Sequence, residues 1–278
     1  MRVSAVQMNA GADKRDNIAQ ARRLIDGAVA ADRPDIISLP EVWSCRGGDR
    51  DGKFRQAEEL PPPGSNTPGG EAYEFLRATA REKQIHVHGG SIGEKGGDRL
   101  FNTTVVFDPT GTELARYRKI HLFDITTPEG LVFGESRTYA PGEDVVTYQA
   151  GGVTVGCAIC YDVRFPEMFL KLRRAGAELI FLPSAFTLQT GKDHWEVLIR
   201  ARAIETQCWI AAPAMSGPHV EGNGETRHTF GHSLIANPWG HVVAMASDGP
   251  GWCTSSIDTA LTARIRNDMP VLSQRKLA

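Results

Sequence analysis

Alternation of apolar with small or polar residues recurs along the chain and predicts a series of short β-strands. The predicted strands cover residues 2–8, 35–39, 85–91, 103–107, 112–118, 145–148, 153–159, 178–182, 208–213, 230–236, 241–246 and 252–257. Between them, apolar residues at helical spacing predict helices over 16–31, 70–83, 166–174 and 192–207. Asp258 is expected to cap a final helix. Strands that alternate with helices in this way predict an α/β fold.

Turn signals connect these elements without dividing the chain. The sequence Asp108-Pro109-Thr110-Gly111 predicts a hairpin turn, as does Gly151-Gly152, and Pro238-Trp239-Gly240 predicts a turn near the end. Residues 49–70 are polar and rich in glycine and proline, so we expect an ordered loop without a regular element. We therefore expect one domain over residues 1–278, with mixed β-sheets covered by helices.

Charge and hydropathy narrow the classes of partner. The 278 residues carry a formal net charge of -2, with acidic and basic residues scattered along the chain, so no basic stripe points to nucleic acid. No apolar run approaches the roughly 20 residues that span a bilayer. The first residues enter a strand pattern rather than a signal peptide. We expect a soluble, cytoplasmic protein that binds neither nucleic acid nor membrane.

The cysteine pattern favours reduced thiols. Cys45, Cys157, Cys160, Cys208 and Cys253 are odd in number and widely spread, which is unlike a disulfide framework. Cys157 and Cys160 form a C-x-x-C, but residues three apart in a strand point to opposite faces. No second pair completes four zinc ligands. A redox or metal role is therefore disfavoured, and we expect no metal.

The position of Cys160 makes it a candidate nucleophile. The strand predicted over 153–159 ends at this cysteine, a polar turn follows, and Phe165-Pro166-Glu167 opens a helix with proline in its first turn. A thiol at a strand-to-helix corner can stand clear of the sheet, with free amides of the turn beside it. The alternative is a buried cysteine that serves as a small hydrophobic residue.

Two charged residues occupy comparable positions. Glu41 follows the strand predicted over 35–39, and Lys119 follows the strand over 112–118, so both lie past carboxyl ends of strands, where α/β sheets build their sites. Taken singly, each is an ordinary solvated charge. Together they could supply the base and the positive charge that a thiol of ordinary pKa needs as a nucleophile.

Three separated segments carry a resemblance to a known family. Leu39-Pro40-Glu41, residues 117–124 (YRKIHLFD) and residues 160–167 (CYDVRFPE) resemble, in order and spacing, the signature blocks of the nitrilase superfamily of carbon-nitrogen hydrolases. The resemblance runs from residue 2 to about 275. It implies a four-layer αββα sandwich with two mixed β-sheets, a homodimer or higher homo-oligomer, and no cofactor.

The resemblance also implies roles. Glu41 corresponds to the general base, Lys119 to the group that stabilises the tetrahedral intermediate, and Cys160 to the nucleophile that forms a thioester. Glu135 matches a second glutamate that some members use, although read alone it is an ordinary turn residue. We expect the Tyr161 backbone amide to act with Lys119 as an oxyanion donor.

The substrate is less sharply defined. Residues 186–208 and 269–272 resemble the branch that hydrolyses deaminated glutathione, and the neighbouring branch is the ω-amidases, which act on α-keto acid monoamides. Both imply a small amide that bears a carboxylate; N-carbamoyl compounds and nitriles stay open. Arg164 could bind the carboxylate or form an ion pair with Asp162 or Glu167. Trp43 is either a pocket wall or core, in a segment (42–48) that departs from both branches.

Three competing interpretations are weaker. Residues 89–93 match the G-x-S-x-G of a serine-hydrolase elbow, but residues 94–98 are unsuited to open the helix that it requires. His86 and His88 share a strand face without an evident third metal ligand. A catalytically silent binding subunit is the non-enzyme alternative, and the presence of all three catalytic residue types argues against it.

Overall fold

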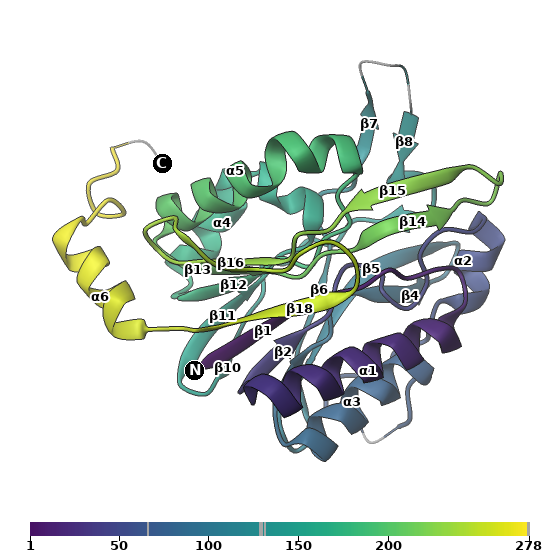
Figure 1. Cartoon of the computed structure of the whole chain (residues 1–278), viewed down its shortest axis with the longest axis horizontal. Coiled ribbons are helices and arrows are strands. Elements are labelled where there is room, and N and C mark those ends of the chain that lie inside the picture. The colour runs from purple at the N-terminus through teal and green to yellow at the C-terminus, as the bar shows by residue number, and fades with distance from the viewer. Residues whose placement is uncertain (66, 128–129, 131, 277–278) are drawn as a thin grey trace.

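Two mixed β-sheets lie face to face between two layers of helices (Figure 1). The computed structural model describes residues 1–65, 67–127, 130 and 132–276. Helices α1 (Lys14–Asp32) and α3 (Glu71–Lys83) cover the outer face of the first sheet, and α4 (Pro166–Arg174) and α5 (Leu188–Thr206) cover that of the second. This arrangement confirms the predicted four-layer αββα sandwich.

The first sheet combines parallel and antiparallel strands. Its strands run in the order β18-β1-β2-β3-β5-β4, and β6 and β9 also pair with β5. Their bounds are β18 (Gly251–Ser256), β1 (Arg2–Gln7), β2 (Ile36–Ser38), β3 (His86–His88), β5 (Arg99–Phe107), β4 (Ile92–Gly96), β6 (Glu113–Arg118) and β9 (Tyr139–Ala140).

The second sheet has a parallel centre flanked by antiparallel strands, in the order β10-β11-β12-β13-β16-β17. Its strands are β10 (Thr147–Ala150), β11 (Val153–Cys157), β12 (Leu179–Phe181), β13 (Trp209–Ala212), β16 (Leu234–Ala236) and β17 (Val242–Met245). Two hairpins lie outside the sheets: β7 (Asp124–Thr126) with β8 (Val132–Gly134), and β14 (Ser216–Val220) with β15 (Thr226–Phe230).

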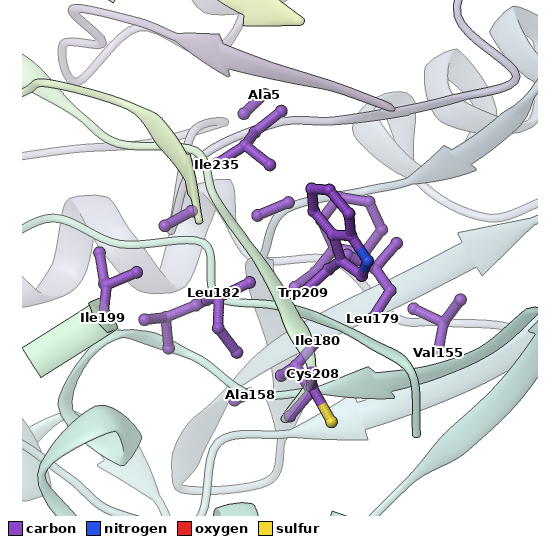
Figure 2. Close-up of a cluster of buried hydrophobic side chains, with 14 of the residues drawn as sticks. Ala5, Val155, Ala158, Leu179, Ile180, Leu182, Ile199, Cys208, Trp209 and Ile235 are labelled. Carbon is purple, nitrogen blue, oxygen red and sulfur yellow. The ribbon is translucent and has the colours of Figure 1, made fainter. Parts of the chain in front are cut away.

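The core between the sheets is apolar and closely packed. Figure 2 shows part of it, where Leu179 and Trp209 of the second sheet belong to the same buried cluster as Ala5 of β1. His88 of β3 stacks on Phe181 of β12, with 4.5 Å between ring centroids. The side chains of the two inner faces therefore hold the sheets together.

The helices begin where their sequences supply a cap or buried face. In α1, Ala21, Ile25 and Ala28 are fully buried against the sheet, as the helical spacing predicted, and Asp13 caps its first turn. Asp258 likewise accepts hydrogen bonds from two amides at the start of α6 (Thr259–Asp268), which confirms the predicted cap. In the part of the chain that is described, no helix combines the length and apolar character needed to cross a bilayer.

Two predictions about local structure are wrong. Residues 49–70 are not free of regular structure, because α2 (Arg50–Gln56) forms there with Asp49 as its cap; its polar sequence gives no apolar periodicity to detect. The strand predicted over 230–236 is broken, because Gly231 (φ 78°) and His232 (φ 56°) turn the chain between β15 and β16.

Candidate active site

Cys160 lies at the sharp turn that was predicted between strand and helix. Strand β11 ends at Cys157, and the 3-10 helix η2 (Cys160–Arg164) precedes α4. Cys160 has a φ of 46°, a left-handed conformation that costs energy for a residue with a side chain. Its N–H donates to the Pro183 carbonyl at 2.9 Å. Cys160 as a whole is only 7% exposed, and from this strained turn it lines a cavity.

Lys119 lies between two carboxylates. Its Nζ donates to Glu41 Oε1 at 2.8 Å and to Glu135 Oε2 at 2.8 Å and Oε1 at 3.1 Å. The Lys119 side chain is 2% exposed and that of Glu41 5%. Glu135, in the 3-10 helix η1 (Glu135–Arg137), also accepts from the Phe123 N–H at 2.7 Å. The structure thus brings together Glu41, Lys119 and Glu135 as expected.

Asn102 of β5 joins this group, and sequence reasoning missed it. Its Nδ2 donates to Glu41 Oε1 at 2.9 Å and to Glu135 Oε1 at 3.2 Å, and its backbone carbonyl accepts from the Lys119 backbone N–H at 2.9 Å. The available signal was an amide side chain in a strand that, after its exposed first residue Arg99, otherwise carries apolar and hydroxyl side chains. Asn102 fixes both carboxylates relative to each other.

The charges in the cluster determine each resting protonation state. Burial alone would raise the pKa of Glu41, but Lys119, with smaller contributions from Arg46 and Cys160, outweighs burial, and the pKa is lowered. Burial alone would lower the pKa of Lys119, but Glu135 and Glu41 together raise it well above its usual range. For Cys160, burial and Glu41 raise the pKa well above that of a free thiol, against the opposing effect of Lys119. At neutral pH the group is therefore a carboxylate, an ammonium and an uncharged thiol.

Asp162 links the Lys119 segment to the Cys160 turn. Its fully buried carboxylate accepts from the Tyr117 hydroxyl at 2.6 Å, from His121 Nδ1 at 2.7 Å and N at 3.1 Å, and from the Ile159 N–H at 2.8 Å. Tyr117 and His121 flank Lys119, and Ile159 precedes Cys160. The sequence had indicated Asp162 only as a possible partner for Arg164. The alternation of Tyr117, Lys119 and His121 was the signal that could have pointed to its contacts with Tyr117 and His121.

The cavity beside Cys160 has a volume of about 230 Å³. Aromatic rings and four basic side chains line it in addition to the cluster: Phe123, Phe133, Tyr139, Tyr161, Phe186, Arg46, Lys53, Arg164 and Arg227. Tyr161 packs edge-on against Phe123 and Phe165. Its backbone amide belongs to the first turn of η2, where amides have no partner within the helix. The lining thus combines apolar aromatic surface with positive charge.

Arg164 and Trp43 have different surroundings. Arg164 lines the cavity, lies near the Tyr161 and Phe186 rings, and its Nη2 is 3.2 Å from His194 Nδ1. Among the described residues it forms no ion pair with Asp162 or Glu167. Trp43, in contrast, is fully buried against Phe75, donates to the Gly89 carbonyl at 2.8 Å and is not part of the cavity lining.

The competing motifs have no matching structural context. Residues 89–91 connect β3 to β4, and residues 92 and 93 begin β4, a strand rather than the helix of a serine-hydrolase elbow. Cys157 is buried in the core, away from the cavity lining that Cys160 joins. Over the described ranges, no group of three or more His, Cys, Asp or Glu side chains is placed to hold a metal ion.

Comparisons with known proteins agree with this geometry. The chain is 37% identical over 279 residues to deaminated glutathione amidase of Synechocystis sp. (strain PCC 6803 / GT-S), covering 98% of this chain and 97% of that one. It is 37% identical over 275 residues to human omega-amidase NIT2, covering 99% and 95%.

Two solved structures share the fold. The NitFhit protein of C. elegans matches with a TM-score of 0.88 and 33% identity, over 99% of this chain and 65% of that longer chain. Nit3 of Saccharomyces cerevisiae, a member of the nitrilase superfamily, matches with a TM-score of 0.86 and 29% identity, over 100% and 97%. The model of the carbon-nitrogen hydrolase family matches residues 2–267. With this sandwich fold and nearly full-length relatives, the chain belongs to the carbon-nitrogen hydrolases of the nitrilase superfamily.

Proposed function

We propose that this carbon-nitrogen hydrolase is an amidase that cleaves a small carboxylate-bearing amide through a thioester on Cys160. The observation that carries the proposal is the contact network in which Lys119 Nζ lies 2.8 Å from both Glu41 and Glu135, beside the buried thiol. A thiol, a base and a fixed ammonium are the groups that acyl transfer to cysteine requires.

In the first half-reaction, Glu41 takes the thiol proton as Cys160 Sγ attacks the amide carbon. The carbonyl oxygen becomes an oxyanion, which the Lys119 ammonium and the Tyr161 N–H stabilise. The C–N bond then breaks, and Glu41 returns the proton to the leaving nitrogen. A neutral amine departs, and the acyl group stays on Cys160 as a thioester.

In the second half-reaction, Glu41 takes a proton from water, whose oxygen attacks the thioester carbon. The same donors stabilise the second oxyanion, the C–S bond breaks, and the sulfur regains its proton. Because Glu135 and Asn102 hold Lys119 and Glu41 by hydrogen bonds, the donors need little reorganisation between the steps.

The basic lining of the cavity supports a substrate with a carboxylate. Arg164 lies on the turn that carries Cys160, and its planar guanidinium can bind two carboxylate oxygens. We propose deaminated glutathione as the substrate, because the relative from Synechocystis bears that name at 37% identity. An α-keto acid monoamide is the second candidate, since human omega-amidase is equally similar.

The direct test is hydrolysis of deaminated glutathione and α-ketoglutaramate by purified protein, followed by mass spectrometry of the denatured enzyme after brief mixing. We expect product release and an acyl adduct on Cys160. Cys160→Ala should give neither, and Cys157→Ala is the matched control that should keep both. An adduct on Cys157, or turnover by Cys160→Ala, would refute the proposed nucleophile.

We also propose a homodimer. Supporting it, large apolar side chains are exposed on α5 and near β17: Val197, Ile204, Trp239, Val243 and Met245. Light scattering of the purified protein should give twice the mass of one chain, and the mass of a single chain would refute it. A cytoplasmic location stays a prediction.

A further inference from the structure

Arg202 of α5 reaches the turn that carries Cys160. This arginine is 6% exposed, and its Nε donates to the Val163 backbone carbonyl of η2 at 2.7 Å. Its Nη1 lies 2.6 Å from an oxygen of Glu205, three residues further along α5, whose side chain is 43% exposed. Arg202 and Val163 are not among the described residues that line the cavity beside Cys160. The direct route from Arg202 to the reacting group is therefore the backbone of η2.

The Val163 carbonyl needs a donor from outside its own helix. In a 3-10 helix each carbonyl accepts from the N–H three residues ahead, and the residue three after Val163 is Pro166, which has no N–H. Pro166 is the first residue of α4, a position that favours proline. Val163 is fully buried, so bulk water cannot supply the missing donor. The Arg202 guanidinium supplies it in a charge-assisted hydrogen bond.

The turn is strained and is held at both ends. Cys160 has a φ of 46°, and such a conformation persists only where the surrounding contacts fix it. The Cys160 N–H donates to the Pro183 carbonyl at the start of η2. The Asp162 carboxylate accepts from the Ile159 N–H just before that helix. At the end of η2, the corresponding contact is that of Arg202.

Arg202 also contacts the helix that follows η2. Its guanidinium carbon lies 5.8 Å from the centroid of the Phe169 ring of α4, and Phe169 is fully buried. A second contact between α5 and η2, from His194 to Arg164, is exposed and joins two side chains rather than holding the backbone. Loss of the Arg202 side chain would therefore leave the junction of η2 and α4 without its buried anchor on α5.

We infer that Arg202 is a positioning residue, which acts through the Val163 carbonyl to hold the strained turn of Cys160 in place. The sulfur is thereby kept beside the Glu41–Lys119 pair of the first sheet. The inference rests on the proposed function. Because Arg202 lies outside the cavity lining, its loss should lower kcat and leave KM nearly unchanged. A misplacement of about 1 Å at the reacting atoms can cost about 100-fold in rate.

The test uses two substitutions that differ by one donor. Arg202→Gln keeps an N–H donor, because glutamine Nε2 is as many bonds from Cα as arginine Nε, whereas Arg202→Met has a methyl group there. The substrate is deaminated glutathione or α-ketoglutaramate, whichever the native enzyme hydrolyses. We expect kcat per folded chain to fall about 10- to 100-fold in Arg202→Met, with KM within about twofold of native. Arg202→Gln should recover much of this loss.

Urea unfolding gives the folded fraction of each variant. A purely structural role of Arg202 would lower stability and the folded fraction, but it would leave kcat per folded chain unchanged. The comparison of kcat with KM therefore separates positioning of the nucleophile from general support of the fold.

Arg200 provides a matched control on the same helix. Its Nε donates to the Gly240 carbonyl at 2.8 Å, and it forms an ion pair with Glu196 at 3.3 Å. Gly240 belongs to the turn between β16 and β17, not to η2. Arg200→Met breaks the same kinds of contact as Arg202→Met and should leave kcat and KM at their native values.

Hydrogen exchange followed by mass spectrometry reports on the turn without a substrate. The amides of residues 160–165 should exchange faster in Arg202→Met than in the native protein, Arg202→Gln or Arg200→Met. If Arg202→Met fails to fold, Arg202→Lys replaces it, because lysine keeps the charge but has a methylene group at the position of Nε.

The inference would be overturned by a kcat per folded chain in Arg202→Met or Arg202→Lys that is no lower than in Arg202→Gln. An equal fall of kcat in Arg200→Met, or unchanged exchange over residues 160–165, would also overturn it. Failure of the native enzyme to hydrolyse either amide or to acylate Cys160 would instead refute the proposed function, and the exchange comparison would still decide whether Arg202 holds the turn.

Discussion

The Cys160 thiol is stored in its protonated form. Burial and the neighbouring Glu41 carboxylate both disfavour a thiolate, and Lys119 compensates only in part. This arrangement differs from a preformed thiolate–imidazolium pair, because the proton leaves only when a base takes it. The nucleophile is thereby protected from oxidation and alkylation until an amide is in position.

Replacement of Glu41 should therefore separate reactivity toward alkylating agents from catalysis. In Glu41→Gln the base is lost, so amide turnover should fall by at least about 100-fold. The pKa of Cys160 should fall because Lys119 is no longer opposed by Glu41, and iodoacetamide should label the variant faster than the native enzyme at pH 7. Labelling rates across pH 6–10 measure this shift, with Cys160→Ala as the control for other thiols. A variant that is labelled more slowly at pH 7 would contradict the proposed charge balance.

Asp162 is a positioning residue rather than a reacting one. Asp162→Asn keeps the size of the side chain but replaces one acceptor oxygen with an NH2 donor. In one orientation this donor would face the Ile159 N–H and the Tyr117 hydroxyl, and in the other it would face the two His121 nitrogens. We expect about 1–3 kcal/mol of lost stability. We also expect kcat to fall about 10- to 100-fold with a smaller change in KM, because the turn that carries Cys160 shifts relative to Lys119.

Urea unfolding and steady-state kinetics measure the two effects of Asp162→Asn. Tyr117→Phe provides a milder control, since it removes one of the donors and leaves the carboxylate. If kcat stayed at the native value while stability fell, Asp162 would be structural only.

The reacting side chains could be predicted from the sequence, but the residues that position them, Asn102 and Asp162, could not. Glu41, Lys119 and Cys160 lie past strand ends in short recognisable segments, so local pattern and residue type were sufficient. Asn102 and Asp162 make side-chain contacts with side chains 33 to 61 positions away, and no local pattern specifies which residues pair over that separation. Trp43 was ambiguous for the same reason, since only packing against Phe75 places it in the core.

Glu58, which follows α2, connects α1 and α3, two helices that the sequence presents as separate. It forms an ion pair with Lys14 of α1 at 2.7 Å, and it accepts from the Ala72 and Tyr73 amides at the start of α3. The α3 cap residue Gly70 has no side chain to do this, and a Cβ there would lie 2.4 Å from the Glu58 carboxyl carbon. The segment after α2 is thus built around one buried carboxylate.

Glu58→Ala should lower the free energy of unfolding by about 3–5 kcal/mol. The substitution leaves Lys14 as an uncompensated buried charge, and it leaves the first amides of α3 without the carboxylate that accepts their hydrogen bonds. The double variant Lys14→Met/Glu58→Ala should recover part of this loss, since no buried charge remains. Chemical denaturation of the single and double variants provides the comparison. Equal stability of the single variant and the native protein would contradict this role of Glu58.

The two sheets meet through apolar side chains and one buried histidine. His88 is fully buried between Ser38, whose Oγ lies 3.1 Å from Nδ1, and the Phe181 ring of the other sheet. Burial lowers the pKa of His88 from 6.5 to about 3, so the folded chain holds a neutral imidazole. The docked sheets therefore exclude a charge that the unfolded chain accepts readily.

This buried imidazole makes stability depend on pH. Above pH 6.5 both states hold neutral His88, and its contribution is fully present. As the pH falls toward 3, the unfolded state binds a proton that the folded state does not, so stability declines by up to about 1.4 kcal/mol per pH unit from this residue. In His88→Gln this part of the slope should be absent. Urea unfolding at pH 7, 6, 5 and 4 measures it, and identical slopes for both proteins would rule out the effect.

The α/β class with mixed sheets followed from the alternation of strand and helix periodicity along the sequence, whereas the four-layer arrangement was implied by the resemblance to the family. Short pieces such as β7, β8, β9 and β14 were missed, because two- to five-residue strands, with glycine and proline in β14, carry too little pattern. Pairing with a partner strand, not local preference, determines these strands: β7 with β8, β14 with β15, and β9 with β5.

Each sheet contributes only part of the reacting group. Glu41, Asn102 and Lys119 follow or belong to strands of the first sheet, whereas Cys160 follows a strand of the second. Hydrolysis therefore reports on whether the halves of the sandwich are correctly apposed. A fragment that ends before β10 would carry the base and the ammonium without the sulfur, so turnover restored by mixing two separately produced halves would be a direct signal of their reassembly.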